Sequence, residues 1–279
     1  MFKAALTHDI DRVKKTTQYF THSLRGVLNG NFSNALKNLR GIGNRNREYW
    51  NFERIMEIED KYSVRSSFYF LNEPANINIF DFRRFKNSFG RYRITEQRVA
   101  DIIKLLNMGN WEIGLHGSFN SFKSLDMLKR EKKELESVLG AGVIGIRQHY
   151  LNLDGIDTWK RQSEAGFLYD SSFGYTKGIG FKEGICRPFN PFNNRFTVFP
   201  LAVMDYNFAT AKNKWDEFNS LCRTIEKEGG ILVLNWHNCA FSKNDYPGSE
   251  ELYIECIKRC LDAGGIFKTL RQFYFEGMQ

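Results

Sequence analysis

The stretch Ala5-Leu6-Thr7-His8-Asp9-Ile10-Asp11 (ALTHDID) places two acids and a histidine directly after the first apolar residues of the chain. Charged residues in that position are typical of a parallel α/β sheet, where a buried strand ends at the functional edge. Asp9 and Asp11 are two residues apart, so an extended chain points both side chains the same way and His8 the other way. We therefore expect the strand to end at about Thr7 and both acids to face one site.

Apolar runs of strand length recur along the rest of the chain. Each is apolar on both faces, as parallel strands covered on both sides are. Including the first, we expect strands at 2–7, 66–71, 111–116, 143–147, 167–170, 197–204 and 231–236.

Segments with helical periodicity lie between these runs. We expect helices at about 47–62, 95–109, 124–139, 157–165, 215–227 and 250–263. Alternation of strand and helix predicts a parallel sheet, and about seven repeats favour closure into a distorted (β/α) barrel. We expect one α/β domain over residues 1–279, with a basic helical insertion at about 13–46 and a long ordered loop at 173–196.

The composition supports a globular protein with a basic surface. Hydrophobic residues are 42% of the chain and aromatic residues 15%, which is enough for a large core and excludes disorder. The formal charge is +8, and much of the excess lies between Lys14 and Arg47. That run indicates either a solvated helical face or a surface for an acidic partner.

The cysteines and the apolar runs bear on the cellular compartment. The five cysteines form no C-x-x-C pair and are odd in number, which favours reduced thiols. No apolar run approaches the roughly 20 residues needed to span a bilayer, and no signal-peptide pattern precedes the first strand. We expect a cytoplasmic protein.

Four of the five histidines lie at or just past the end of a predicted strand: His8, His116, His149 and His237. In a parallel barrel these ends meet on one face, where acids and an arginine join them. These are Asp9, Asp11, Arg147 and Asp170. A single strand-end histidine could equally be structural, but the whole set is typical of a metal-activated water with a general base and a general acid.

The motifs that carry these residues resemble those of a known family. In chain order they are THDID, GLHGSFN, IRQHY, YDSS and LNWH. They resemble the five motifs of the polysaccharide deacetylases of the NodB-like type, also called carbohydrate esterase family 4. The resemblance implies a distorted barrel and the hydrolysis of an acyl group from a sugar.

The resemblance also implies residue roles. Asp9 would be the catalytic base, and Arg147 would orient it. Asp11 and His116 would bind the metal, and the backbone N–H of Tyr150 would stabilise the oxyanion. His237 would be the catalytic acid, with Asp170 raising its pKa.

The sequence departs from the family pattern at two positions. Asn120 stands where the family has its second metal-binding histidine, and His149 stands where it has proline. An amide oxygen is a poor zinc ligand, so His149 or His8 could supply the missing nitrogen, while Asn120 ligates weakly or makes an outer contact. His149 could also contact substrate or be structural.

Each of three other residues has two alternative roles. Arg187, in CRPFNPF, could grip an anionic or sugar substrate or merely pack on the barrel rim. Trp236 could be a sugar platform, although barrel core is favoured. Asp205 could face the mouth or cap the next helix.

These observations predict a metal-dependent hydrolase that removes an N- or O-acyl group, most simply acetyl, from an amino sugar or polysaccharide precursor. The cofactor expected is Zn²⁺, with Ni²⁺, Co²⁺ or Fe²⁺ as alternatives, and the substrate could carry phosphate. No nucleic-acid partner is expected. The alternatives are a noncatalytic glycan-binding barrel that has lost its metal, and an amide hydrolase or deformylase acting on a small substrate.

Overall fold

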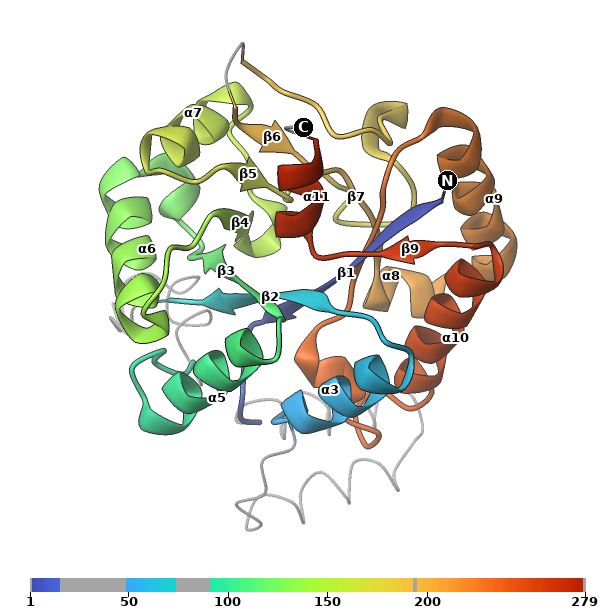
Figure 1. Cartoon of the computed structure of the whole chain (residues 1–279), viewed down its shortest axis with the longest axis horizontal. Helices are drawn as coiled ribbons and strands as arrows, with labels where there is room; N and C mark the ends of the chain where they lie inside the picture. Colours follow the sequence, from blue (N-terminus) through green and yellow to red (C-terminus); the bar gives the residue numbers. More distant parts are fainter. Residues whose placement is uncertain (1, 16–48, 74–90, 193–194, 278–279) are drawn as a thin grey trace, which may run out of the picture.

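The computed structural model describes residues 2–15, 49–73, 91–192 and 195–277 (Figure 1). Most of the predicted basic insertion at 13–46 lies outside these residues.

Strands form at all seven predicted places. The run at 197–204 divides into two strands, and a short ninth strand near the C-terminus was not predicted. The strands are β1 (Lys3–Ile10), β2 (Ser66–Leu71), β3 (Glu112–Gly117), β4 (Gly145–Gln148), β5 (Tyr169–Asp170), β6 (Thr197–Val198), β7 (Leu201–Met204), β8 (Leu232–Asn235) and β9 (Ile266–Phe267).

The strands form one sheet in the order β6-β5-β4-β3-β2-β1-β8-β7, and β9 pairs with β1. Every pairing between these strands is parallel. The two ends of this order, β6 and β7, are consecutive in the chain and are separated by Phe199 and Pro200. The sheet therefore curls into the predicted distorted (β/α) barrel. Its two edge strands, β6 and β7, are joined by this short connection.

Six of the helices match the predictions, and the short α8 and α11 were missed. The helices are α3 (Phe52–Lys61), α5 (Gln97–Met108), α6 (Leu125–Leu139), α7 (Ile156–Glu164), α8 (Asp205–Thr210), α9 (Lys214–Glu228), α10 (Ser249–Asp262) and α11 (Leu270–Glu276). Ser124 caps α6 by accepting from the Met127 N–H, and Gly140 ends it with a left-handed φ of 75°. Most of these helices surround the strands, and α11 lies across one end of the barrel (Figure 1).

The strands alternate between two buried clusters. Phe68 and Phe70 of β2 join the larger cluster beneath the surrounding helices, whereas Tyr69 joins a smaller one with Ala5, Val233 and other residues of the opposite face. A strand points successive side chains to opposite faces, so the smaller cluster fills the inside of the barrel. Every second residue of a strand therefore faces the inside of the barrel, up to the carboxyl end of that strand.

Helix α11 closes the amino end of the barrel. The Leu270 N–H donates to Ser67 Oγ at 3.1 Å, and the Arg271 N–H donates to Glu112 Oε2 at 2.9 Å. Tyr169 Oη also donates to Glu112, at 2.5 Å. The buried carboxylate of Glu112 therefore ties α11 to the amino end of the barrel.

The first strand is longer than predicted. We expected it to end at about Thr7, but β1 continues to Ile10 and pairs Asp9 with Tyr69 of β2. The acid does not end the strand because buried partners satisfy its side chain while β2 satisfies the backbone.

Two further expectations concern the thiols and the membrane. All five cysteines are free, as predicted. Within the part of the chain that the structure describes, no helix has the length and apolar character needed to cross a membrane.

Candidate active site

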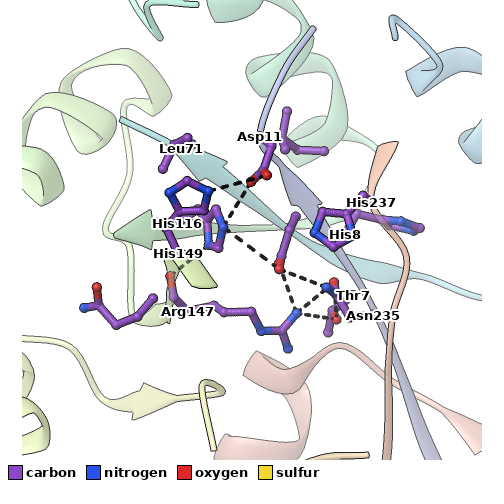
Figure 2. A network of polar contacts seen from close by, with 12 residues as sticks. Thr7, His8, Asp11, Leu71, His116, Arg147, His149, Asn235 and His237 are labelled. Carbon is purple, nitrogen blue, oxygen red and sulfur yellow. Dashed lines mark hydrogen bonds and ion pairs between the residues drawn. The ribbon is translucent and has the colours of Figure 1, made fainter. Parts of the chain in front are cut away.

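Polar residues from distant parts of the chain meet at the carboxyl end of the barrel (Figure 2). They line a cavity of about 180 Å³. The lining residues are Asp9, Asp11, His116, His149, Tyr150, Leu151, Thr176, Met204 and His237. The convergence that the strand-end histidines suggested is therefore present for three of them, and His8 is the exception.

Arg147 holds Asp9 on the inner face. The guanidinium is fully buried, and its Nη1 donates to Asp9 Oδ1 at 3.1 Å, to Thr7 Oγ1 at 2.7 Å and to Asn235 Oδ1 at 2.9 Å. The second oxygen of Asp9 accepts from Asn235 Nδ2 at 2.9 Å. Burial alone would raise the pKa of Asp9, but the charges of Arg147, His116 and His237 together outweigh burial and the pKa is lowered. The carboxylate is thus ionised and fixed in direction.

Asp11 faces two neighbouring histidines, His116 and His149 (Figure 2). Its Oδ1 is 3.2 Å from His116 Nε2, and its Oδ2 is 3.5 Å from His149 Nε2. One ligand atom from each of the three residues lies within 4.8 Å of the others. This separation suits atoms that share one metal ion.

The tautomer of His116 also favours a ligand. Its Nδ1 lies 3.0 Å from the Arg147 carbonyl oxygen. Because a carbonyl only accepts, Nδ1 carries a hydrogen, and in the neutral ring this leaves the lone pair on Nε2, the ring nitrogen 3.2 Å from Asp11 Oδ1.

His149 is buried in a strained turn after β4. Tyr150 and Leu151, which follow it, have φ values of 60° and 54°, a left-handed conformation that is unusual for residues other than glycine. Arg91 Nη2 lies 3.3 Å from His149 Nε2, and Arg91 Nη1 donates to the Asp11 carbonyl at 2.7 Å. On the other side of the ring, His149 Nδ1 lies 3.8 Å from Glu73 Oε2.

Opposite charges shift the ionisation of this group. Burial would raise the pKa of Asp11, but His149 and His116 hold it well below its usual value. Burial would lower the pKa of His149, and the charge of Asp11 raises it instead. Asp11 is therefore ionised, and its negative charge favours positive charge on the groups around it.

Asp205, and not Asp170, supports His237. The Asp205 carboxylate accepts from the backbone N–H of His237 at 2.8 Å, and its oxygens lie 3.0 and 3.1 Å from His237 Nδ1. Burial alone would lower the pKa of His237, but the charge and hydrogen bond of Asp205, joined by the charges of Asp11 and Asp9, raise it to about 10. The pairing of Asp170 with His237 that the motifs implied is therefore wrong.

Asp170 instead hydrogen-bonds within the side of the barrel, to α7 and to the segment after β5. It accepts from Gln162 Nε2 at 2.9 Å and from the N–H and Oγ of Ser172 at 2.8 and 2.6 Å. Ser172 Oγ in turn accepts from the Gln148 N–H at 2.8 Å. Burial raises the pKa of Asp170. Its visible role is to fix the end of β4, directly before His149.

Asn120 does not line the cavity. It is half-buried and precedes the short 3₁₀ helix η2 (Ser121–Lys123), where its carbonyl accepts from the Lys123 N–H at 3.2 Å. Within the described residues, the candidate ligand group forms without it. Asn120, where the resemblance implied a second metal-binding histidine, therefore lies outside the cavity, whereas His149 lines it.

The three expected substrate-binding residues lie in different surroundings. Tyr150 lines the cavity and is 57% exposed. Arg187 is exposed at the opposite end of the barrel, where its Nε donates to the Glu228 carbonyl just before β8 begins. It lies there because the chain must return to the amino end before β6, so the expected grip on substrate is wrong.

Trp236 is also absent from the cavity. It is fully buried in the larger core cluster, and its Nε1 donates to Ser249 Oγ at 3.0 Å. It follows Asn235 on the outer face of β8, so the platform role is wrong and the core role is confirmed.

His8 lies behind the site, on the outer face of β1. Its Nδ1 is 2.7 Å from the Trp236 carbonyl, and its Nε2 is 2.9 Å from Glu59 Oε1. Glu59 also accepts from Tyr253 Oη at 2.8 Å. His8 therefore points away from the acids, as predicted, and is not part of the candidate ligand group.

A second cavity of about 460 Å³ adjoins the first, with which it shares Asp11 and His237. Between α8 and α10 it is lined by Tyr206, Tyr246 and Pro247 among others. This space gives room for a substrate much larger than an acyl group on the side of His237.

The geometry defines a parallel β/α barrel with a candidate hydrolytic site at its carboxyl end, and solved structures share this fold. No known family matches the sequence in a family scan, and no curated protein sequence matches it. A structure from Mycobacterium smegmatis assigned as a polysaccharide deacetylase is similar at a TM-score of 0.60 and 17% identity, covering 98% of this chain and 89% of that one.

Two further structures show the same likeness. One from Pseudomonas aeruginosa PAO1, also assigned as a polysaccharide deacetylase, has a TM-score of 0.60 and 12% identity over 98% of this chain and 89% of that one. The PuuE allantoinase has a TM-score of 0.53 and 15% identity over 92% of this chain and 84% of that one. The chain thus has the polysaccharide deacetylase fold that its motifs predicted.

Proposed function

We propose that this protein is a metal-dependent hydrolase that removes an N- or O-acyl group, most simply acetyl, from an amino sugar or polysaccharide precursor. One observation carries the proposal. Asp9, held by Arg147, and His237, held by Asp205, line the same cavity as the cluster of Asp11, His116 and His149. The allantoinase likeness is consistent with hydrolysis of a C–N bond on this fold.

The residues present fit a divalent metal ion. One carboxylate and two imidazoles are a usual zinc set that leaves a position open for water. The Oδ1 atom of Asp11 is buried and makes no hydrogen bond, which an ion would remedy. Asp11, His116 and His149 would hold the ion. When bound, it would supply a water of lowered pKa and polarise the acyl carbonyl.

The other residues would move protons and stabilise charge. Asp9 would take a proton from the attacking water, because Arg147 and Asn235 keep its carboxylate ionised and aimed. The N–H of Tyr150 would donate to the developing oxyanion. His237, protonated through Asp205, would give its proton to the leaving amine or alcohol.

The adjoining cavity supports a substrate of sugar size. The leaving group must lie against His237 to receive its proton, and His237 also lines the larger cavity. Apolar and tyrosine walls of this kind suit the face of a sugar ring. We further propose a cytoplasmic precursor as substrate, which could carry phosphate.

Acetate release tests the proposal. Zinc-loaded protein is expected to release acetate from at least one member of a panel of N- and O-acetylated sugars, their phosphates and short acetylated oligosaccharides. Asp9→Asn is expected to lower kcat by about 10²-fold or more while zinc still binds, because the general base is lost and the ligands remain. A panel without acetate release, or an Asp9→Asn variant with full activity, would reject it.

Elemental analysis separates the enzyme from a noncatalytic barrel. Protein purified from metal-supplemented medium is expected to carry close to one equivalent of Zn, Ni, Co or Fe. Less than about a tenth of an equivalent would favour the glycan-binding alternative. Formate release in place of acetate would indicate a deformylase on the same scaffold.

A further inference from the structure

In the proposed metal site, the third ligand is His149, which stands where the family pattern has proline. A neighbouring group must therefore orient its ring. A ligating histidine usually gives its second ring nitrogen to an acceptor that fixes its tautomer and direction. For His116 this acceptor is the Arg147 carbonyl, 3.0 Å from Nδ1. His149 lies at the end of the next strand, β4, and needs an equivalent.

Glu73 occupies the required place. It follows β2, is 9% exposed, and its Oε2 accepts from the Phe119 N–H at 2.9 Å. The same oxygen lies 3.8 Å from His149 Nδ1. That Nδ1 is buried and has no hydrogen-bond partner, although a carboxylate faces it.

The contact on the other ring nitrogen gives the tautomer independently. Arg91 Nη2 lies 3.3 Å from His149 Nε2. A guanidinium only donates, so Nε2 accepts and its lone pair points out of the ring on the side of Asp11. In the neutral ring the hydrogen is then on Nδ1, the atom that faces Glu73.

We propose that Glu73 is the positioning residue that makes His149 the third metal ligand. By accepting Nδ1–H it fixes the tautomer that presents Nε2 toward Asp11, and its charge makes that nitrogen a stronger donor. The inference rests on the metal site of the proposed function. It also explains how the cluster works without a ligand at Asn120.

A neighbouring glutamate provides a matched control. Glu131 of α6 is also buried, and it accepts from the Ser118 N–H at 3.0 Å and from Ser118 Oγ at 2.5 Å. The two glutamates thus hold consecutive amides of the turn after β3, but only Glu73 faces a histidine of the cluster. If a glutamate acted only by holding this turn, replacing either Glu73 or Glu131 would have the same effect.

The experiment measures zinc affinity by competition with a chromophoric chelator, and the electronic absorption spectrum of the Co²⁺ form. It compares wild type with Glu73→Gln, Glu131→Gln, His149→Ala and the double variant Glu73→Gln/His149→Ala. Glu73→Gln is expected to weaken zinc binding by about 10- to 100-fold and to change the Co²⁺ spectrum. Glu131→Gln is expected to do neither. The double variant is expected to bind as His149→Ala does, because Glu73 acts through His149.

Three results would overturn the inference. The first is that Glu73→Gln binds zinc as tightly as wild type. The second is that the double variant loses zinc-binding free energy equal to the sum of the losses in its two single variants. The third is that wild type binds neither zinc nor cobalt. Should Glu73→Gln fail to fold by circular dichroism, Glu73→Asp serves instead, and unchanged affinity there counts against the inference. Zinc binding that depends on Glu73 without acetate release would sustain it and reject the deacetylase.

Discussion

At the scale of single residues, the site is organised by acids and amides that the motifs did not reveal. Arg147 was expected to orient Asp9, and it does so at 3.1 Å, but Asn235 completes the arrangement by bonding to both. Arg147 also donates to the Ser171 carbonyl and hydroxyl, so its guanidinium reaches β1, β8 and the segment after β5 at once, which lysine could not. The Asp9 carboxylate is therefore held from two directions.

Because Asp205, and not Asp170, contacts His237, the two acids should have different effects on the pH profile. Removing the Asp205 charge should lower the pKa of His237, so the acid form is lost at lower pH. For Asp205→Asn the alkaline limb of kcat/KM is expected to move down by about 1 to 3 pH units. A pH–rate series of both variants checks this. Asp170→Asn should leave that limb in place, and a limb that moves only in Asp170→Asn would contradict the pairing seen here.

The sequence could identify only part of this site. Asp9, Asp11, Arg147 and His237 were recognisable because each stands at a strand end within a short motif. Asp205 was left ambiguous because its role depends on β7 lying beside β8, 32 residues along the chain from His237. Glu73 was missed altogether, since it belongs to no periodic element and its partners lie in two later turns.

At the scale of elements, most strands and the amphipathic helices were predictable, whereas β9, α8 and α11 were not. The run at 66–71 matches β2 fully, because six buried residues in succession leave little ambiguity. In contrast, β9 has two residues and α11 has seven, too few to show a period. Both form because tertiary contacts at the barrel floor stabilise them.

The tight inner packing of β4 predicts a stability effect. A Cβ built on Gly145 would lie 2.1 Å from atoms of the Tyr169 ring, which is itself bonded to Glu112. Gly145→Ala is expected to lower the free energy of unfolding by about 1–3 kcal/mol, because neither the pleated backbone nor the ring can move freely. Urea denaturation measures it. Gly142→Ala, where the nearest atom is 3.9 Å away, serves as the control and should change little.

At the scale of the whole molecule, stability should depend on the ionisation of one buried acid. Burial raises the pKa of Glu131 from 4.5 to about 7. Between these values the folded protein binds more protons than the unfolded chain, so stability is highest below the lower value and falls as pH rises through the higher. The loss is about 3 kcal/mol at most, by the standard conversion of a pKa shift.

Replacing this acid tests the dependence. Glu131→Gln is expected to flatten the fall in unfolding free energy between about pH 5 and about pH 8. Urea unfolding of wild type and variant at both pH values provides the measurement. An equal slope for the two proteins would show that Glu131 titrates at its ordinary pKa.

The central place of β1 has a consequence for how the protein is made. This first strand pairs with β8 and β9, and Thr7 Oγ1 donates to the Leu234 carbonyl, 227 positions later. A ribosome adding about 5 to 20 residues per second needs roughly 10 to 45 s to supply those partners. Among the residues of the cavity, Asp9 and Asp11 therefore emerge before the others and wait longest, and the nascent chain cannot assemble its cavity until β8 and His237 have been synthesised.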